Sequence, residues 1–162
     1  MTMGLVSIII LVGFFISLFP AMAFAIERDL PQDGDRVYGS NMVALTSGLW
    51  VLGLGIAGLY YRKRSQVHKR LMFLATIVIL WPAWGRWRHY FPDTIDDNWF
   101  MLYLPFSFII WAWIWEKRVY GKIHPILLII GILIIAEGFL SSLYIGSEYC
   151  TALIKKLYSL HI

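Results

Sequence analysis

Two opposite charges lie inside apolar stretches of this sequence, and they are the strongest candidates for chemistry. Glu137 lies within the apolar run 123–145, and Arg86 lies near the end of the apolar run 71–90. A charged side chain deep in a bilayer costs roughly 3 kcal/mol or more, so such a charge usually faces protein or water and has a partner. We therefore predict that Arg86 and Glu137 form an intramembrane polar pair.

Equal depth supports this pairing. Both runs are predicted to cross the membrane from the inside to the outside. Arg86 lies fifteen residues after Leu71, and Glu137 lies fourteen residues after Ile123. At about 1.5 Å per residue, both charges lie roughly 21–23 Å from the inner face. This depth is in the outer third of a hydrocarbon core that is about 30 Å thick.

Further polar residues extend from this pair towards the outer side. Pro82 precedes Arg86 by one turn and is expected to kink the helix, which frees a backbone carbonyl. His89 follows one turn later on the same face. With Asp93 and Asp96 they form a predicted polar track. The pair is interpreted either as a structural ion pair or as a proton or ligand site. Alternatively, Arg86 extends to the headgroups and makes no such contact.

Two histidines are the only candidate cofactor ligands. His68 and His124 begin two predicted spans at the inner face, and two histidines on neighbouring helices could hold haem b. Simpler interpretations exist for both residues. His68 lies among basic residues that suit lipid headgroups, and His124-Pro125 is typical of a helix start. The lone Cys150 excludes an intramolecular disulfide, and no spacing predicts a metal site or a catalytic group.

The composition excludes a typical water-soluble domain. Of the 162 residues, 59% are hydrophobic and 15% are charged. About 20 apolar residues span a bilayer as a helix. The sequence therefore predicts an all-α integral membrane bundle, a single domain over residues 1–162 with five transmembrane helices. The expected spans are 5–25, 41–61, 71–90, 99–115 and 123–145.

Charge in the connections predicts the orientation. Basic residues gather in the second and fourth connections: Arg62, Lys63, Arg64, Lys69, Arg70, Lys117, Arg118 and Lys122. Acidic residues gather in the other two: Glu27, Asp29, Asp33, Asp35, Asp93, Asp96 and Asp97. Positive connections stay in the cytoplasm, so we expect the N-terminus inside and the C-terminus outside a bacterial inner membrane. Because the bases flank spans, they indicate contact with lipid headgroups and not with nucleic acid.

The two ends of the chain are less regular. Ala21, Ala23 and Ala25 would fit a signal-peptide cleavage site, but no base precedes the apolar run, so a retained helix is favoured. After the fifth span, apolar residues recur at helical spacing around Lys155 and Lys156. This predicts a short amphipathic helix on the outer membrane surface, or else a frayed tail.

Part of the sequence resembles a family. The segments are His68-Lys-Arg-Leu-Met72, Ala75-Thr76, Pro82-Ala83 with Arg86, and Gly121-Lys-Ile-His-Pro125. They are similar to a motif of uncharacterised bacterial polytopic membrane proteins. The resemblance covers about residues 68–125 and implies no reaction. It does imply that His68, Arg70, Arg86 and His124 belong together.

Three hypotheses for function follow. The leading one is a small membrane protein without catalysis of its own, acting as a helical bundle or an accessory subunit of other membrane proteins or of itself. The second is an electron-transfer module that binds haem b or a quinone. The third is a component of a proton-coupled transporter or channel, based on Arg86, His89 and Glu137.

Overall fold

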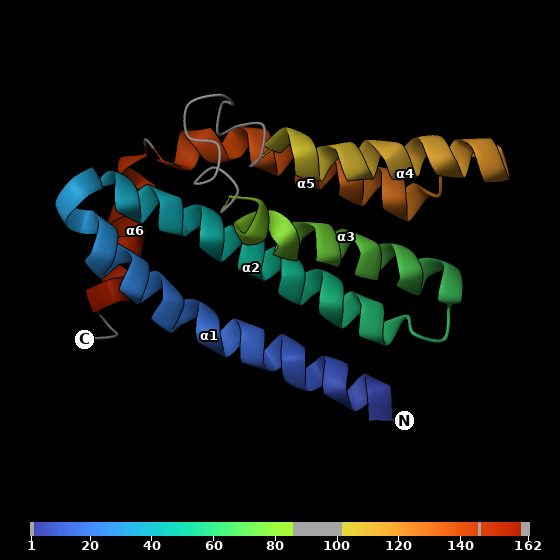
Figure 1. Ribbon diagram of the computed structural model, residues 1–162, viewed down its shortest axis with the longest axis horizontal. Coiled ribbons are helices and arrows are strands. Elements are labelled where there is room, and N and C mark those ends of the chain that lie inside the picture. The colour runs from blue at the N-terminus through green and yellow to red at the C-terminus, as the bar shows by residue number, and fades with distance from the viewer. Residues whose placement is uncertain (1, 86–101, 146, 160–162) are drawn as a thin grey trace. The chain divides into compact units, whose positions relative to one another are not determined.

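The computed structural model describes residues 2–85, 102–145 and 147–159, and the regular secondary structure of this part of the chain is helical throughout (Figure 1). It contains six α-helices and no strand, which confirms the all-α prediction. The helices are α1 (Thr2–Asp33), α2 (Arg36–Tyr60), α3 (Ser65–Gly85), α4 (Leu104–Tyr120), α5 (Pro125–Ile145) and α6 (Glu148–Ser159).

Two helices within the described residues are long and apolar enough to cross a membrane. They are the segment Ile9–Gln32 of α1 and the whole of α2, Arg36–Tyr60. A shorter apolar helical segment, Pro125–Ser141, lies in α5. Length and composition thus support membrane association, and the arrangement with five spans stays a prediction.

The first helix is longer than expected. It continues to Asp33, through Glu27 and Asp29, which were predicted to lie in a connection. The helix ends at the first residue that readily takes a left-handed backbone conformation. Gly34 has φ +57°, and its N–H donates to the Leu30 carbonyl at 3.1 Å. Glycine allows such a C-terminal cap without a Cβ clash, so the chain turns here and not earlier.

The fourth helix ends later in the chain than the predicted span 99–115. The described helix begins at Leu104, has Pro105 in its first turn and ends at Tyr120. Gly121 caps it with φ +71°. Glycine suits the position after the last turn of a helix, so Gly121 explains the later end.

The chain forms two compact units, the first made of residues 1–52 and 140–162. Its core consists of buried residues from α1, the start of α2 and α6: Met22, Ile26, Val37, Tyr38 and Ile154. Ile154 is only 1% exposed. The predicted C-terminal amphipathic helix is therefore present as α6, and it uses part of its apolar face to pack against protein.

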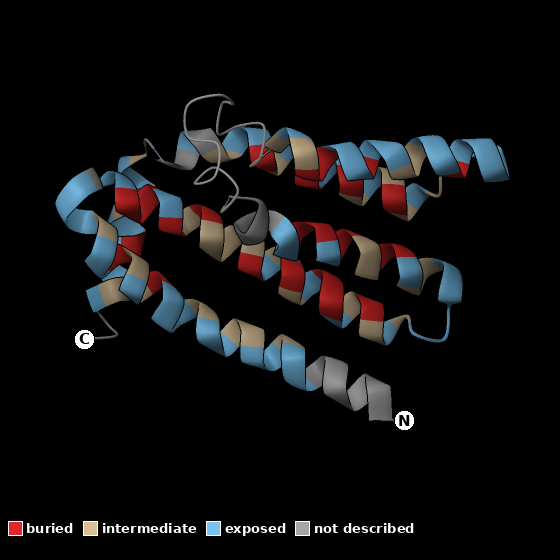
Figure 2. Ribbon diagram, in the orientation of Figure 1, coloured by how far each residue is buried: buried red, intermediate tan, exposed pale blue. Residues whose placement is uncertain are grey.

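The second unit comprises residues 53–139. Its buried apolar residues come from α2 to α5 and include Leu54, Leu71, Leu74, Ile77, Phe106, Ile109, Leu127 and Ile134. Figure 2 shows buried positions recurring along α3 and α4. Gly131 of α5 lets the helices approach closely, since a Cβ there would lie 2.9 Å from both Ile109 and Trp113. This packing positions the polar groups of the candidate site.

Candidate functional site

A buried ion pair joins α3 to α4 in the second unit. Arg70, in the second turn of α3, donates from Nε to Oε1 of Glu116 at 2.6 Å. Its Nη2 lies 2.5 Å from the same oxygen. The two side chains are only 8% and 9% exposed. Charged groups buried this far from water require a partner of opposite charge, and Arg70 and Glu116 are each other's partner.

The remaining polar atoms of this pair are also engaged. Nη1 of Arg70 donates to the backbone carbonyl of Gln66 and, at 3.0 Å, to its side-chain oxygen. The second oxygen of Glu116 accepts a hydrogen bond from the backbone N–H of His124 at 2.8 Å. The network therefore ties α3, the end of α4 and the residue before α5 together. Within the described residues, no buried side-chain nitrogen or oxygen lacks a partner.

His124 caps the start of α5. Its ring Nδ1 accepts a hydrogen bond from the backbone N–H of Ile126 at 3.3 Å. Burial, and secondly the charge of Arg70, lower the pKa of His124 below its ordinary value, although Glu116 opposes them. A neutral ring that accepts at Nδ1 has its hydrogen on Nε2. Ligation of haem iron by His124 would therefore require the other tautomer or the loss of this hydrogen bond.

His68 has a different role at the α2–α3 connection. Its Nδ1 lies 2.8 Å from the carbonyl oxygen of Gly58. A carbonyl only accepts, so Nδ1 is the donor. Gly58 lies in the last turn of α2, where carbonyls lack a partner within the helix. His68 satisfies one of them and thereby fixes the turn between α2 and α3.

A groove of about 290 Å³ lies beside the ion pair, between α3 and α4. Its lining residues are Lys69, Arg70, Phe73, Trp111, Ala112, Trp115, Glu116, Tyr120 and Leu127. The Lys69 ammonium lies 5.7 Å from the centre of the Tyr120 ring. The rings of Trp111 and Trp115 are 5.9 Å apart. The groove therefore combines Lys69 and the Arg70–Glu116 pair with a wall of aromatic rings.

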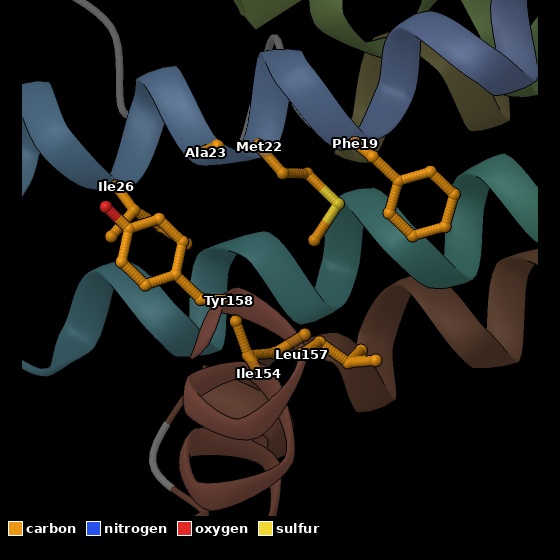
Figure 3. A pocket seen from close by; sticks show the side chains of 7 residues that line it. All are labelled: Phe19, Met22, Ala23, Ile26, Ile154, Leu157 and Tyr158. Carbon is orange, nitrogen blue, oxygen red and sulfur yellow. The ribbon is translucent and has the colours of Figure 1, made fainter. Parts of the chain in front are cut away.

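A second hollow of about 180 Å³ lies in the first unit, between α1 and α6. Figure 3 shows its lining: Phe19, Met22, Ala23, Ile26, Ile154, Leu157 and Tyr158. At its edge the Tyr158 hydroxyl hydrogen-bonds to Glu27 at 3.3 Å. The lining is apolar apart from the hydroxyl of Tyr158.

Most residues of the predicted polar pair and polar track lie outside the described part of the chain. Arg86, His89, Asp93 and Asp96 all lie in the range 86–101, which is not described. Pro82 lies within α3, and Glu137 is half-buried on α5. The Arg86–Glu137 pair therefore stays a prediction. No group of three or more His, Cys, Asp and Glu side chains that could hold a metal occurs in the described part of the chain.

The sequence analysis missed the ion pair that is observed. Arg70 was assigned to a basic connection, and Glu116 was not singled out. A usable signal was present, because Glu116 is the only acidic residue between Asp97 and Glu137, and it is followed by three bases within six residues. A single carboxylate beside a basic connection is a natural partner for a buried cation.

No family model, curated protein or solved structure matches this chain at a significant level. Two of the four sequence segments on which the resemblance was based, 68–72 and 121–125, are joined in space. Arg70 in the first and His124 in the second both bind Glu116.

Proposed function

We propose that this protein is a small integral membrane protein that acts as a helical accessory subunit, without catalysis of its own. The observation that carries this proposal is the complete internal pairing of the buried polar side chains in the described part of the chain. Arg70 and Glu116 use their polar atoms on Gln66, on His124 and on each other. Groups engaged in this way hold helices together, which is a structural role.

Exposed apolar side chains support the membrane location. On α1, Ile16 is 65% exposed and Phe24 is 63% exposed, and similar residues face outward on α4 and α5 (Figure 2). In water, such contiguous apolar surface would promote aggregation. In lipid it is the favourable surface, because hydrocarbon tails are as apolar as these side chains.

The five-span bundle is the arrangement that best fits these helices. At about 1.5 Å per residue, the 21 residues of α5 are long enough for a core about 30 Å thick. Basic residues in the α2–α3 and α4–α5 connections place both connections in the cytoplasm. The N-terminus is then inside and the C-terminus outside the inner membrane of a bacterium.

Membrane integration and orientation can be tested by extraction and labelling. Alkaline carbonate should leave the protein in the membrane pellet. In a Cys150→Ser background, single cysteines at Ser40 and Ser65 should react with an impermeant maleimide from opposite sides of the membrane. Release by carbonate would contradict membrane integration, and labelling of both sites from one side would contradict the orientation.

The accessory role requires a separate test. The tagged protein, purified in mild detergent, should comigrate on a native gel with other membrane polypeptides or with further copies of itself. The protein separated from those partners should have no visible absorption band and no turnover. A Soret band after haem-replete expression, or catalysis by the isolated chain, would contradict the proposal.

A further inference from the structure

The groove between α3 and α4 has a polar end and an apolar end. Lys69 and Tyr120 lie at one end. Phe73 is one turn further along α3, and Trp111 is nine residues before Tyr120 on α4, about 13 Å along the helix. Lys69 contacts Tyr120 while Arg70 contacts Glu116, so the two helices run in opposite directions. The groove between them therefore changes from polar to apolar along its length.

Positive charge is in excess at the polar end. Glu116 already neutralises Arg70. Lys69 is a second cation in the lining of the groove, and Glu116 is the one carboxylate among the described residues that line it. Two cations and one anion therefore line the groove, and this excess of positive charge favours a bound negative group at Lys69.

The apolar end would not attract a free anion. Phe73, Trp111, Trp115 and Leu127 supply most of the lining there. Trp and Tyr rings of membrane proteins prefer the headgroup level, with their polar edges towards water and their faces against hydrocarbon. The volume of about 290 Å³ is at the small end of the ~300–1,000 Å³ typical of ligand pockets, so it suits part of an amphiphile.

We propose that this groove binds an anionic phospholipid of the cytoplasmic leaflet, with the phosphate at Lys69 and an acyl chain along Phe73, Trp111 and Trp115. The proposal rests on the membrane integration proposed above. Basic pockets between membrane helices on the cytoplasmic side commonly bind acidic headgroups. Lys69 supplies the charge, and the aromatic wall supplies the contact that a soluble phosphate could not use.

Lipid retention by the purified full-length protein tests this assignment. The protein in mild detergent is mixed with equal amounts of phosphatidylglycerol and phosphatidylcholine that have identical chains, and bound lipid is counted by native mass spectrometry. The wild type should retain phosphatidylglycerol in preference. Lys69→Gln should lower that retention about fivefold, the effect of one base near an anionic headgroup. Lys63→Gln removes an exposed charge away from the groove and should behave as wild type.

Equal retention of the two lipids by the wild type would overturn the proposal, and so would equal effects of the two lysine variants. Displacement of the lipid by soluble glycerol phosphate would also overturn it, because the site would then belong to a free phosphate. Carbonate extraction of the same variants separates this proposal from the proposed function. A protein that stays in the membrane but shows no lipid preference disproves only the lipid site. Release from the membrane disproves the integration on which the site depends.

Discussion

Two ion pairs, one in each unit of the chain, have the same chemistry and opposite surroundings. Arg70 and Glu116 are 8% and 9% exposed and share several further hydrogen bonds. Lys155 of α6 and Asp35 are 2.8 Å apart but 45% and 70% exposed. An exposed pair typically contributes about 0–1 kcal/mol, whereas breaking a buried pair costs about 3–5 kcal/mol. Position, and not the presence of a pair, therefore decides which contact the fold depends on.

The attachment of α6 illustrates the weaker case. Lys155 also lies 5.0 Å from the ring centre of Tyr38, and Ile154 is buried against α1. The apolar contact of Ile154 is therefore the main attachment of this helix. The exposed ion pair helps to orient the helix and contributes little free energy. In the second unit, the buried charges join helices that also pack through apolar side chains, so the loss of one charge there would leave the other buried without a partner.

The largest expected effect comes from removing one member of the buried pair. Glu116→Leu should lower the free energy of unfolding in detergent by about 3–5 kcal/mol, because it leaves the charge of Arg70 buried without its partner. It also leaves the N–H of His124 without an acceptor. Unfolding by SDS titration, followed by circular dichroism, measures this loss. A loss below about 1 kcal/mol would place the pair in the same class as an exposed one.

A packing change should have the next largest effect. Gly131→Ala places a Cβ 2.9 Å from Ile109 and Trp113, and the Trp113 ring is held by a hydrogen bond to the Leu127 carbonyl. Overpacking of this kind costs about 1–3 kcal/mol. Gly53→Ala is the matched control, since nothing lies within 4 Å of its Cβ. Equal stability of the two variants, measured by the same titration, would show that α4 and α5 are not closely packed.

Acid should weaken the second unit through His124. Burial, with Arg70, lowers the pKa of this ring in the folded state below its value of 6.5 in the unfolded chain. The unfolded state then binds more protons, so stability is complete above pH 6.5 and falls as the pH decreases below that value. His124→Asn keeps a side-chain acceptor at the helix start and should flatten this dependence. An unchanged pH profile in that variant would assign the effect to another group.

The smallest effect is expected at the exposed pair. Lys155→Gln should change the stability of the first unit by about 0–1 kcal/mol. Ile154→Ala should cost more, about 2–5 kcal/mol if the surroundings do not relax, because Ile154 is a fully buried side chain. Hydrogen exchange of the α6 amides reports both changes. A larger loss with Lys155→Gln than with Ile154→Ala would reverse the comparison between the units.

The helices were largely predictable because apolar runs and their flanking charges mark them. The expected spans 41–61 and 123–145 correspond to α2, Arg36–Tyr60, and α5, Pro125–Ile145. The predicted end of the first helix was wrong, because acidic residues were taken to mark a connection. Glu27 and Asp29 are tolerated within a helix, and the chain turns only where Gly34 permits it.

The observed ion pair was not predictable by the same reasoning. The depth argument considered only charges inside apolar runs, whereas Arg70 and Glu116 lie near the ends of their helices. They are separated by 46 positions in the sequence. Residue spacing gives the position of a side chain along its helix. Its neighbour on another helix depends on how the helices are rotated and on turns such as the one at Gly121.

The central claim is that Arg70 and Glu116 stabilise the protein as a unit. A double-mutant cycle with Arg70→Leu, Glu116→Leu and both together measures this directly, by SDS titration in one detergent. The account predicts that the double variant is more stable than either single variant, with a coupling free energy of about 2 kcal/mol or more. Losses that add without coupling would contradict it, because the two side chains would then contribute independently.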